Sequence, residues 1–387
     1  MGTKREEVYC QMKIAIFGAG KAGQYLYSQV KKMEGIEVNG FIDNKLDGQY
    51  EGVDILKPQD YFRIFKDTEA VFLAGGGQKT VKIMIDTVRR YGIDDIYMMH
   101  DIAGKCHLPV FSGKEIIPYR LRKIRFSESK PTLPYYEVPI TDKCNLNCKG
   151  CLFACNVTGS SEHIDKVQIL SDARRMEDLF YDIPWIRILG GEPLMHPDIC
   201  EILEGYRKIF PEAEIDLCTN GLLLLQMGKE FFDCLIKNRI SIHVSVYNPT
   251  YNLLDKIDSL LAKYKLPYAI LKRDKFLKYY TTDPIHDLEK NYELCIASAC
   301  REVYKGKLST CSAAIAFEKF NDQFHTDFKV EKNVDWFDIH DKNLDINRVM
   351  ELIDKPARIC KYCDCCRMES FDWSYASRCP SIKDYTI

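Results

Sequence analysis

The residues of this chain whose type and spacing could do chemistry are its cysteines. There are 17 among 387 residues; four lie between Cys144 and Cys155, and eight lie between Cys295 and Cys379. Disulfide frameworks are typical of short secreted domains, but this chain is long, and its residues 1–10 lack the apolar core of a secretory signal. Two dense groups of thiols therefore indicate ligands for metal or iron–sulfur sites.

The first group has the spacing C-x3-C-x2-C, at Cys144, Cys148 and Cys151, directly after a predicted strand over residues 136–141. Three thiolates on one short loop can hold three irons of a cubane 4Fe–4S cluster, which leaves the fourth iron open to an outside ligand. A zinc site is the alternative, but structural zinc normally takes four ligands. Cys155 lies outside this spacing and is interpreted as a buried thiol.

A second turn of unusual composition follows the next predicted strand, residues 185–189. It reads Gly190, Gly191, Glu192 and Pro193. Catalytic groups of α/β barrels lie at the C-terminal ends of the strands. We therefore expect the cysteine loop and this turn on the same face of a barrel.

These two motifs, in this order and at this distance, resemble those of the radical SAM family over roughly residues 132–275. The resemblance implies that the open iron binds S-adenosylmethionine (SAM) and that one electron cleaves its sulfonium bond. The resulting 5′-deoxyadenosyl radical would abstract a hydrogen atom from a substrate. The resemblance also implies a flavodoxin- or ferredoxin-like electron donor.

The resemblance assigns further residues to SAM. They are Gly190, Gly191, Glu192 and Pro193 at the methionyl ammonium, Asn220 and Ser245 at the ribose and carboxylate, and Phe153 at the adenine. Phe153 is included because the family often has an aromatic residue just before the third cysteine, where this chain has Gly150. The alternatives are structural: a turn residue for Asn220, a polar strand residue for Ser245 and core packing for Phe153.

The second group of cysteines resembles the SPASM/twitch extensions of radical SAM enzymes, since Cys295 and Cys311 flank a glycine hairpin and a later C-x2-C follows. The resemblance implies one auxiliary 4Fe–4S cluster. Its expected ligands are Cys295, Cys311, Cys360 and Cys363, with Cys300, Cys365 and Cys366 as alternatives. A four-cysteine zinc module is the other interpretation. Because this region has few apolar runs, we expect ligation to supply folding energy.

A glycine loop near the N-terminus fits the dinucleotide-binding fingerprint. Gly18, Gly20 and Gly23 lie between a predicted strand and a predicted helix, and Asp43 ends the second strand. The helix N-terminus would favour a phosphate, and Asp43 could accept hydrogen bonds from ribose hydroxyls, which disfavours a 2′-phosphate. NAD or a nucleotide-sugar is the expected ligand; a Rossmann fold kept only for docking is the alternative.

Two series of alternating strands and helices must position these residues. The predicted strands cover residues 13–17, 37–42, 71–74 and 96–99, and then 136–141, 185–189, 214–219, 240–247 and 268–271. Such alternation is typical of parallel α/β sheets. We predict an α/β protein with a Rossmann-like domain over residues 1–110, a linker over 111–131, a partial (β/α)6 radical SAM barrel over 132–290 and a small cysteine-rich, twitch-like domain over 291–387.

Composition argues against two classes of partner, nucleic acid and membrane. The net charge of −2 gives no basic footprint for nucleic acid, and no apolar run approaches the roughly 20 residues that span a membrane. We therefore expect a cytoplasmic enzyme. The first hypothesis is oxidation or epimerisation of a small, sugar-derived or nucleotide-linked substrate. The alternatives are radical modification of a ribosomally made peptide, and a zinc-stabilised NAD-binding protein without radical chemistry.

Overall fold

The computed structural model describes residues 12–33, 35–74, 78–99, 121–157, 162–295, 297–298, 300–353, 355–377 and 379–387. They form two compact units: the described residues up to Arg125 belong to the first, and those from Phe126 onward belong to the second. Each unit is described by itself.

The first unit is built on a seven-stranded sheet in the order β3-β4-β2-β1-β5-β6-β7. Its elements are β1 (Met12–Phe17), α1 (Lys21–Val30), β2 (Ile36–Ile42), β3 (Gly48–Tyr50), β4 (Val53–Leu56), α2 (Pro58–Ile64), β5 (Ala70–Leu73), α3 (Gln78–Arg90), β6 (Ile96–Met99) and β7 (Leu121–Ile124). The central strand β1 pairs in parallel with β2 on one side and β5 on the other. The strand order thus reverses between β1 and β5, the point at which open α/β sheets bind ligands.

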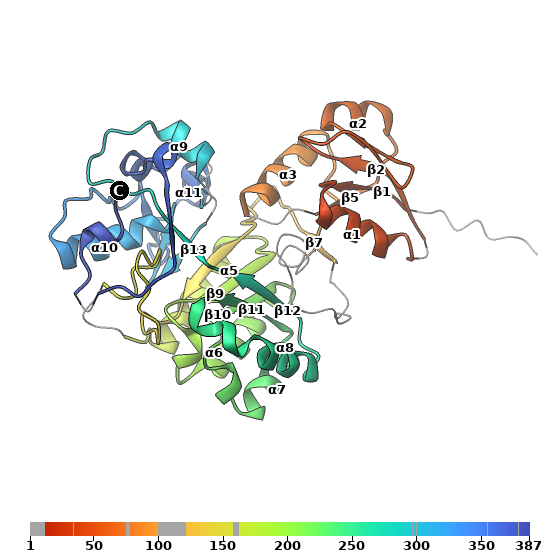
Figure 1. Ribbon diagram of the computed structural model, residues 1–387. Coiled ribbons are helices and arrows are strands. Elements are labelled where there is room, and N and C mark those ends of the chain that lie inside the picture. Colours follow the sequence, from red (N-terminus) through yellow and green to blue (C-terminus); the bar gives the residue numbers. More distant parts are fainter. Residues whose placement is uncertain are drawn as a thin grey trace, which may run out of the picture. The chain divides into compact units, whose positions relative to one another are not determined.

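The second unit begins with a parallel sheet of five strands in the order β12-β11-β10-β9-β8. Its elements are β8 (Tyr136–Pro139), α5 (Lys166–Leu179), β9 (Trp185–Leu189), α6 (Ile199–Ile209), β10 (Glu214–Thr219), α7 (Lys229–Lys237), β11 (Ile240–Val246), α8 (Leu254–Lys263) and β12 (Tyr268–Lys272). Apolar side chains of these strands and helices form one continuous core, and the helices lie outside the sheet in Figure 1. The described strands number five rather than the expected six, because the next strand, β13 (Lys275–Lys278), pairs antiparallel with β17 (Glu369–Asp372) instead of joining this sheet.

The C-terminal part of the second unit is irregular. It contains α9 (Leu288–Leu294), β14 (Val303–Tyr304), β15 (Lys307–Ser309), α10 (Ala313–Phe324), β16 (Trp336–Asp338) and α11 (Ile346–Ile353). It contains a separate buried cluster, in which aromatic residues far apart in the sequence, among them Tyr280, Phe317, Phe320 and Tyr362, pack together. The sequence shows few apolar runs in this region, and the cluster is assembled from several short segments.

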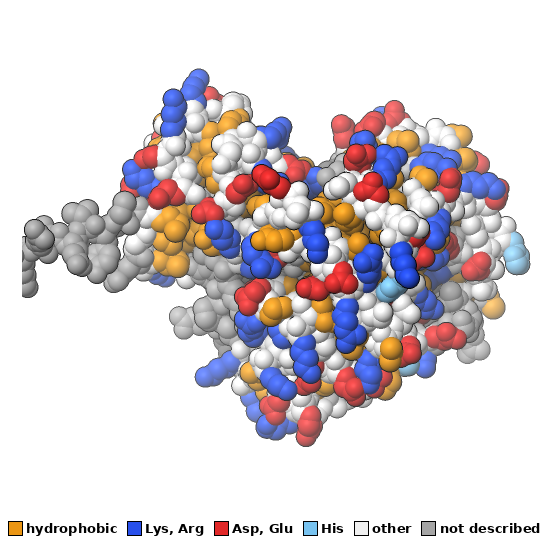
Figure 2. Space-filling model, turned by 180° about the vertical axis from the view of Figure 1, so that it is seen from behind, with side chains coloured by type: hydrophobic (Ala, Val, Ile, Leu, Met, Phe, Trp, Pro, Cys, Tyr) orange, Lys and Arg blue, Asp and Glu red, His pale blue; other side chains and the backbone are white. Residues whose placement is uncertain are grey.

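The described surface carries mixed charge. On the face shown in Figure 2, Lys and Arg side chains are interspersed with Asp and Glu side chains. Within the described part of the chain, no helix combines the length and apolar character needed to cross a membrane.

Candidate functional site

The first cysteine loop follows β8 at the carboxyl edge of the five-stranded sheet. It brings Cys144, Cys148 and Cys151 together: burial raises the pKa of Cys144 to about 12, and the nearby charges of the other two thiols act in the same direction. Two N–H groups already point at this sulfur set. The backbone N–H of Leu146 donates to Cys144 Sγ over 3.4 Å, and the indole N–H of Trp373 donates to Cys148 Sγ over 3.1 Å. Thiols close together with N–H donors fit an iron–sulfur cluster in this loop.

Cys155 takes part in this loop, although its spacing suggested no role. It is buried, and its hydrogen bond with Cys151 is the main reason why the pKa of Cys151 lies below the usual value for a thiol. Next to it, Lys319 donates to the carbonyl oxygen of Phe153 over 3.0 Å and to Asp142 Oδ1 over 2.8 Å. The backbone of Phe153 is therefore fixed by α10, while its ring is only half-buried.

The glycine turn after β9 lies against the segment that leads into the cysteine loop. The N–H of Gly191 donates to the carbonyl of Thr141, and the N–H of Glu192 donates to that of Lys143, each over 2.7 Å. A Cβ atom on Gly191 would lie 2.1 Å from the carbonyl oxygen of Lys143. Any side chain at this position would push the turn and the cysteine loop apart.

The carboxylate of Glu192 ties the ends of two strands together. It is fully buried and accepts hydrogen bonds from Leu194 N, Thr219 Oγ1 and Asn220 N, at 3.0, 2.8 and 2.8 Å. Burial raises the pKa of Glu192 to about 7, although these three hydrogen bonds act to lower it. Because this carboxylate is occupied by donors of its own chain, the turn offers its backbone rather than this side chain to a ligand.

Asn220 joins the third strand of the site to the same loop. Its Nδ2 donates to Asn145 Oδ1 over 2.6 Å, and its Oδ1 accepts from Leu222 N over 3.0 Å. Ser245 is the penultimate residue of β11 and is half-buried. The ends of β8, β9 and β10 are thus linked by hydrogen bonds around the three thiols.

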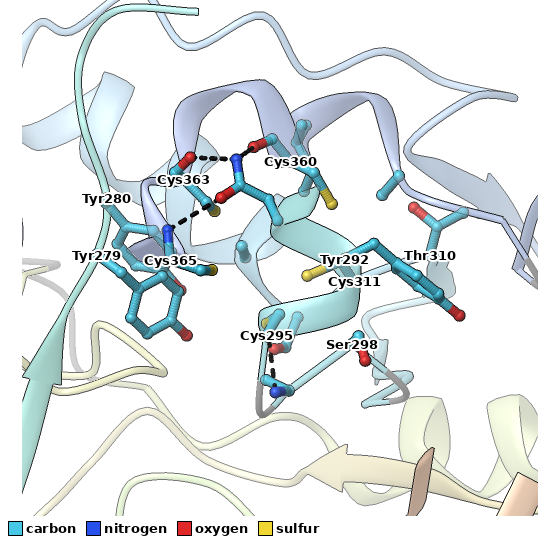
Figure 3. A pocket seen from close by; sticks show the side chains of 16 residues that line it. Tyr279, Tyr280, Tyr292, Cys295, Ser298, Thr310, Cys311, Cys360, Cys363 and Cys365 are labelled. Carbon is cyan, nitrogen blue, oxygen red and sulfur yellow. Dashed lines mark hydrogen bonds between the residues drawn. The ribbon is translucent and has the colours of Figure 1, made fainter. Parts of the chain in front are cut away.

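The second cysteine site is a small pocket in the C-terminal region. Figure 3 shows the sulfur atoms of Cys295, Cys311, Cys360 and Cys363 around one space, although they come from three separate segments. Burial raises the pKa of Cys311 to about 12, with the charge of Cys295 as the next cause. The N–H of Ala297 donates to Cys295 Sγ over 3.3 Å. Four thiols from three segments, gathered at one pocket, suit the four-ligand set of an iron–sulfur cluster.

Asn291, which the sequence reasoning missed, organises this pocket. Its Nδ2 donates to the carbonyl oxygens of Cys360 and Cys363, and its Oδ1 accepts from Cys365 N over 2.9 Å. The available signal was the spacing: Asn291 of α9 lies four residues, about one helical turn, before Cys295, which directly follows this helix.

The surplus cysteines divide between several places. Cys365 lines the pocket, Cys366 is exposed beside His286 and Arg367 at a neighbouring depression, and Cys300 lies outside the lining. Burial and the charge of Glu137 raise the pKa of Cys300. Among the described residues, no group of three or more His, Cys, Asp or Glu side chains is spaced to hold a single metal ion.

The N-terminal glycine loop lies between β1 and α1, and Gly20 is the residue that precedes the helix. A Cβ atom on Gly23 would lie 1.7 Å from the carbonyl oxygen of Gly18, so glycine is needed for helix and loop to approach.

Asp43 fastens this loop to the end of β2. Its Oδ2 accepts from Ala19 N and its Oδ1 from Lys45 N and Leu46 N, at 2.8, 2.8 and 2.9 Å. These N–H groups outweigh partial burial and lower the pKa of Asp43. The carboxylate that was predicted to bind a ribose therefore holds the backbone of two loops in this structure. Residues 75–77, which follow the neighbouring strand β5, lie outside the described residues.

Trp373 is the second residue that the sequence reasoning missed. It is 6% exposed and lies between β17 and the C-terminus. The signal that could have found it is the alternation of Phe371, Trp373 and Tyr375, which predicts a strand with one aromatic face.

Comparison with known proteins gives a family for the five-stranded part. Residues 138–264 match the model described as "Radical SAM superfamily". The probable GTP 3′,8-cyclase of Methanocaldococcus jannaschii is 32% identical over 114 residues, which are 29% of this chain and 36% of that protein. The GTP 3′,8-cyclase of Clostridium perfringens (strain SM101 / Type A) is 35% identical over 100 residues, which are 25% of this chain and 30% of that protein. The chain thus spans about a third of the length of the curated relatives it matches.

A similarity to a solved structure covers more of the chain. The crystal structure of BtrN in complex with AdoMet and 2-DOIA is 13% identical, with a TM-score of 0.39 over 67% of this chain and 100% of that chain.

Proposed function

The chain carries a radical SAM domain over residues 138–264, and on this basis we propose that Cys144, Cys148 and Cys151 hold a 4Fe–4S cluster at which SAM binds. The observation that carries the proposal is the convergence of these three thiols on one loop that the ends of β9 and β10 brace. When bound, the cluster and SAM would supply an electron and a 5′-deoxyadenosyl radical for hydrogen abstraction.

The chain's own residues would then bind and orient SAM. The backbone of Gly190 to Pro193 faces the cysteine loop, and its carbonyl groups can accept from an ammonium. Asn220 is anchored to the loop through Asn145, so its backbone and amide have a fixed position. Ser245 and Phe153 remain our assignments for the ribose or carboxylate and for the adenine.

We assign an auxiliary 4Fe–4S cluster to Cys295, Cys311, Cys360 and Cys363. All four line one pocket, as does Cys365, which is the first alternative ligand. Cys300 and Cys366 are weaker alternatives because neither lines it. In this proposal the region from about residue 291 to 387 is the twitch-like domain, and the barrel before it covers residues 132–290.

The substrate we propose is small and sugar-derived or nucleotide-linked, and the reaction is its oxidation or epimerisation. The support is the first unit, which includes the Rossmann-like domain proposed for residues 1–110 and whose sheet order reverses beside the glycine loop at Gly18 and Gly20. That loop is the proposed site for NAD or a nucleotide-sugar handle. The matched relatives carry the name of an enzyme that acts on a nucleotide, GTP 3′,8-cyclase. A flavodoxin- or ferredoxin-like protein is the proposed electron donor.

Anaerobic reconstitution tests the first cluster. The wild type should be brown, contain about eight irons and release 5′-deoxyadenosine from SAM on reduction. Cys148→Ala should lose about four irons and all SAM cleavage, whereas the control Cys200→Ala, a half-buried cysteine of α6, should match the wild type. Normal cleavage by Cys148→Ala would overturn the proposal. A colourless protein that holds zinc would favour the NAD-binding alternative.

Cys311→Ala tests the auxiliary cluster separately. It should lower the iron content by about four while SAM cleavage continues. An unchanged iron content would overturn the assignment of the second pocket and leave that of the first loop standing.

A further inference from the structure

The C-terminal strap, defined as residues 369–377, crosses the first cysteine loop. It begins with β17, whose first residue, Glu369, lies six positions after Cys363, and then runs antiparallel to the loop at Cys148 and Tyr375. Two backbone hydrogen bonds hold it there: Lys149 N donates to the carbonyl of Ser374 over 3.0 Å, and Ala376 N donates to that of Asn147 over 2.7 Å. The strap therefore has a defined register against the loop.

This register places one aromatic side chain at the sulfur of the middle cysteine. Trp373 is 6% exposed and packs with Cys148 and Leu146 in a small buried cluster. Its ring centroid lies 6.1 Å from that of Tyr247 and 4.8 Å from that of Tyr375. The backbone N–H of Trp373 donates to the carbonyl of Asp274 over 2.7 Å, which fixes the residue from its other side. The indole N–H of Trp373 donates to Cys148 Sγ over 3.1 Å.

The strap also occupies the space beside Gly150. A Cβ atom on this residue would lie 2.8 Å from Cζ of Phe371 and 3.4 Å from the carbonyl oxygen of Asp384. An aromatic ring from more than 200 residues further along the chain thus fills the space beside Gly150. The absence of a side chain at Gly150 thus leaves room for the Phe371 ring of the strap.

We propose that Trp373 is a positioning residue for the cluster of the first loop. Its indole N–H fixes the cluster at Cys148 and makes the cluster easier to reduce. This inference rests on the proposed function. A reduced cluster carries one more negative charge than the oxidised one, so an N–H donor to its sulfur stabilises the reduced state more. The bond is buried, where a hydrogen bond to a charged group is strong.

A redox titration followed by electron paramagnetic resonance tests this. Trp373→Phe keeps an aromatic ring but removes the N–H, and benzothienylalanine at position 373 keeps the whole bicyclic shape while removing only the N–H. In both, the one-electron reduction equilibrium should become about two- to tenfold less favourable, a shift of roughly 20 to 60 mV to more negative potential. The g-values of the reduced cluster should change as well.

Trp336→Phe is the matched control, because Trp336 lies on β16 and contacts Lys307 rather than a cysteine. It should leave the potential unchanged. SAM cleavage by the position-373 variants should fall with a weak reductant and recover with a strong one. Hydrogen exchange of the strap should stay at the wild-type level in the benzothienylalanine variant, which separates the N–H from docking.

The outcomes are distinct. An unchanged potential and unchanged g-values in both position-373 variants, with a reducible cluster in the wild type, would overturn this inference and leave the proposed function intact. Absence of any reducible SAM-binding cluster from the reconstituted wild type would overturn both.

Discussion

The two cysteine sites of the second unit are built in opposite ways. The first places Cys144, Cys148 and Cys151 on one loop within eight residues of sequence, whereas the second collects its thiols from Cys295 to Cys363. The first is held from outside by the backbone of a glycine turn and by the strap. The second is held from inside by the side chain of Asn291.

This difference predicts a different dependence on the bound group. The first loop extends from a five-stranded sheet whose core forms without any cysteine ligand. The second site joins α9, the start of α10 and the turn around Cys360, so its thiols close long loops between separate segments. A group bound to such thiols stabilises the fold, because the unfolded chain has no preformed site. The first cluster should therefore matter for chemistry and the second also for stability.

Loss of each site gives the largest expected effect. Cys311→Ala should lower the midpoint of thermal unfolding of the reconstituted protein by roughly 5 °C or more, since it releases the C-terminal segments. Cys148→Ala should change it by less than about 2 °C. Calorimetry under anaerobic conditions measures both. An equal drop in the midpoint of thermal unfolding would show that both sites contribute alike to stability, and it would contradict the difference proposed between them.

Asn291→Ala tests whether the second site is organised from inside. It removes three hydrogen bonds: the Cys363 carbonyl loses this donor and the Cys365 N–H loses this acceptor, whereas the Cys360 carbonyl still accepts from Cys363 N. We expect a loss of roughly 3 to 5 kcal/mol of unfolding free energy and less iron, with SAM cleavage retained. Asn347→Ala, at an exposed position of α11, is the control and should do neither. A wild-type iron content in Asn291→Ala would show that the cysteines alone organise the second site.

The same contrast explains what the sequence could predict. The nine predicted strands agree with observed strands within a few residues, because apolar periodicity and turn residues are local signals; the strand at 185–189 agrees with β9, and that at 214–219 with β10. The first cysteine loop was readable for the same reason. The count of barrel strands was not, because β13 pairs with β17 about 90 residues later.

Long-range contacts account for the remaining differences. The hydrogen bond from Trp373 to Cys148 joins residues 225 positions apart, and that from Asn291 to the Cys363 carbonyl spans 72. Asp43 was predicted for a ribose, yet its oxygens accept three backbone N–H groups, a use that becomes visible only when the loop after β2 is folded. Residue type and spacing thus identified the thiols, but not the groups that hold them.

Glu192 allows a pH test of the bracing around the first loop. Burial raises its pKa to about 7 in the folded protein, above the value of about 4.3 for an unfolded chain. As the pH rises from about 4 to 7, the unfolded chain ionises first, so stability falls, and it levels off above the folded pKa. Relative to Glu192→Gln, which does not titrate, the wild type should lose on the order of 3 kcal/mol across this range. Denaturant unfolding without SAM measures the difference; parallel curves would show that folding leaves the pKa of Glu192 unchanged.

Gly150 of the first cysteine loop and Gly306 of the hairpin between β14 and β15 give the smallest expected effect. Gly150 and Gly306 both have a positive φ, of 68° and 79°, so alanine is strained at either by about 1 kcal/mol. A Cβ on Gly306 would meet its nearest atom at 3.4 Å, an ordinary contact, whereas one on Gly150 would lie 2.8 Å from the ring of Phe371. Gly150→Ala should therefore destabilise the protein by about 1 kcal/mol more than Gly306→Ala.

The excess should depend on the strap. In a Phe371→Ala background the ring that meets the new methyl is gone, so Gly150→Ala should then lower the free energy of unfolding by about as much as Gly306→Ala does. The double-mutant cycle between positions 150 and 371 measures this coupling directly, by denaturant unfolding of the four proteins. A coupling near zero would mean that the Phe371 ring does not restrict the space available at Gly150. A coupling of about 1 kcal/mol would show that the first cysteine loop, although it spans only eight residues of sequence, depends for its shape on the strap more than 200 residues away.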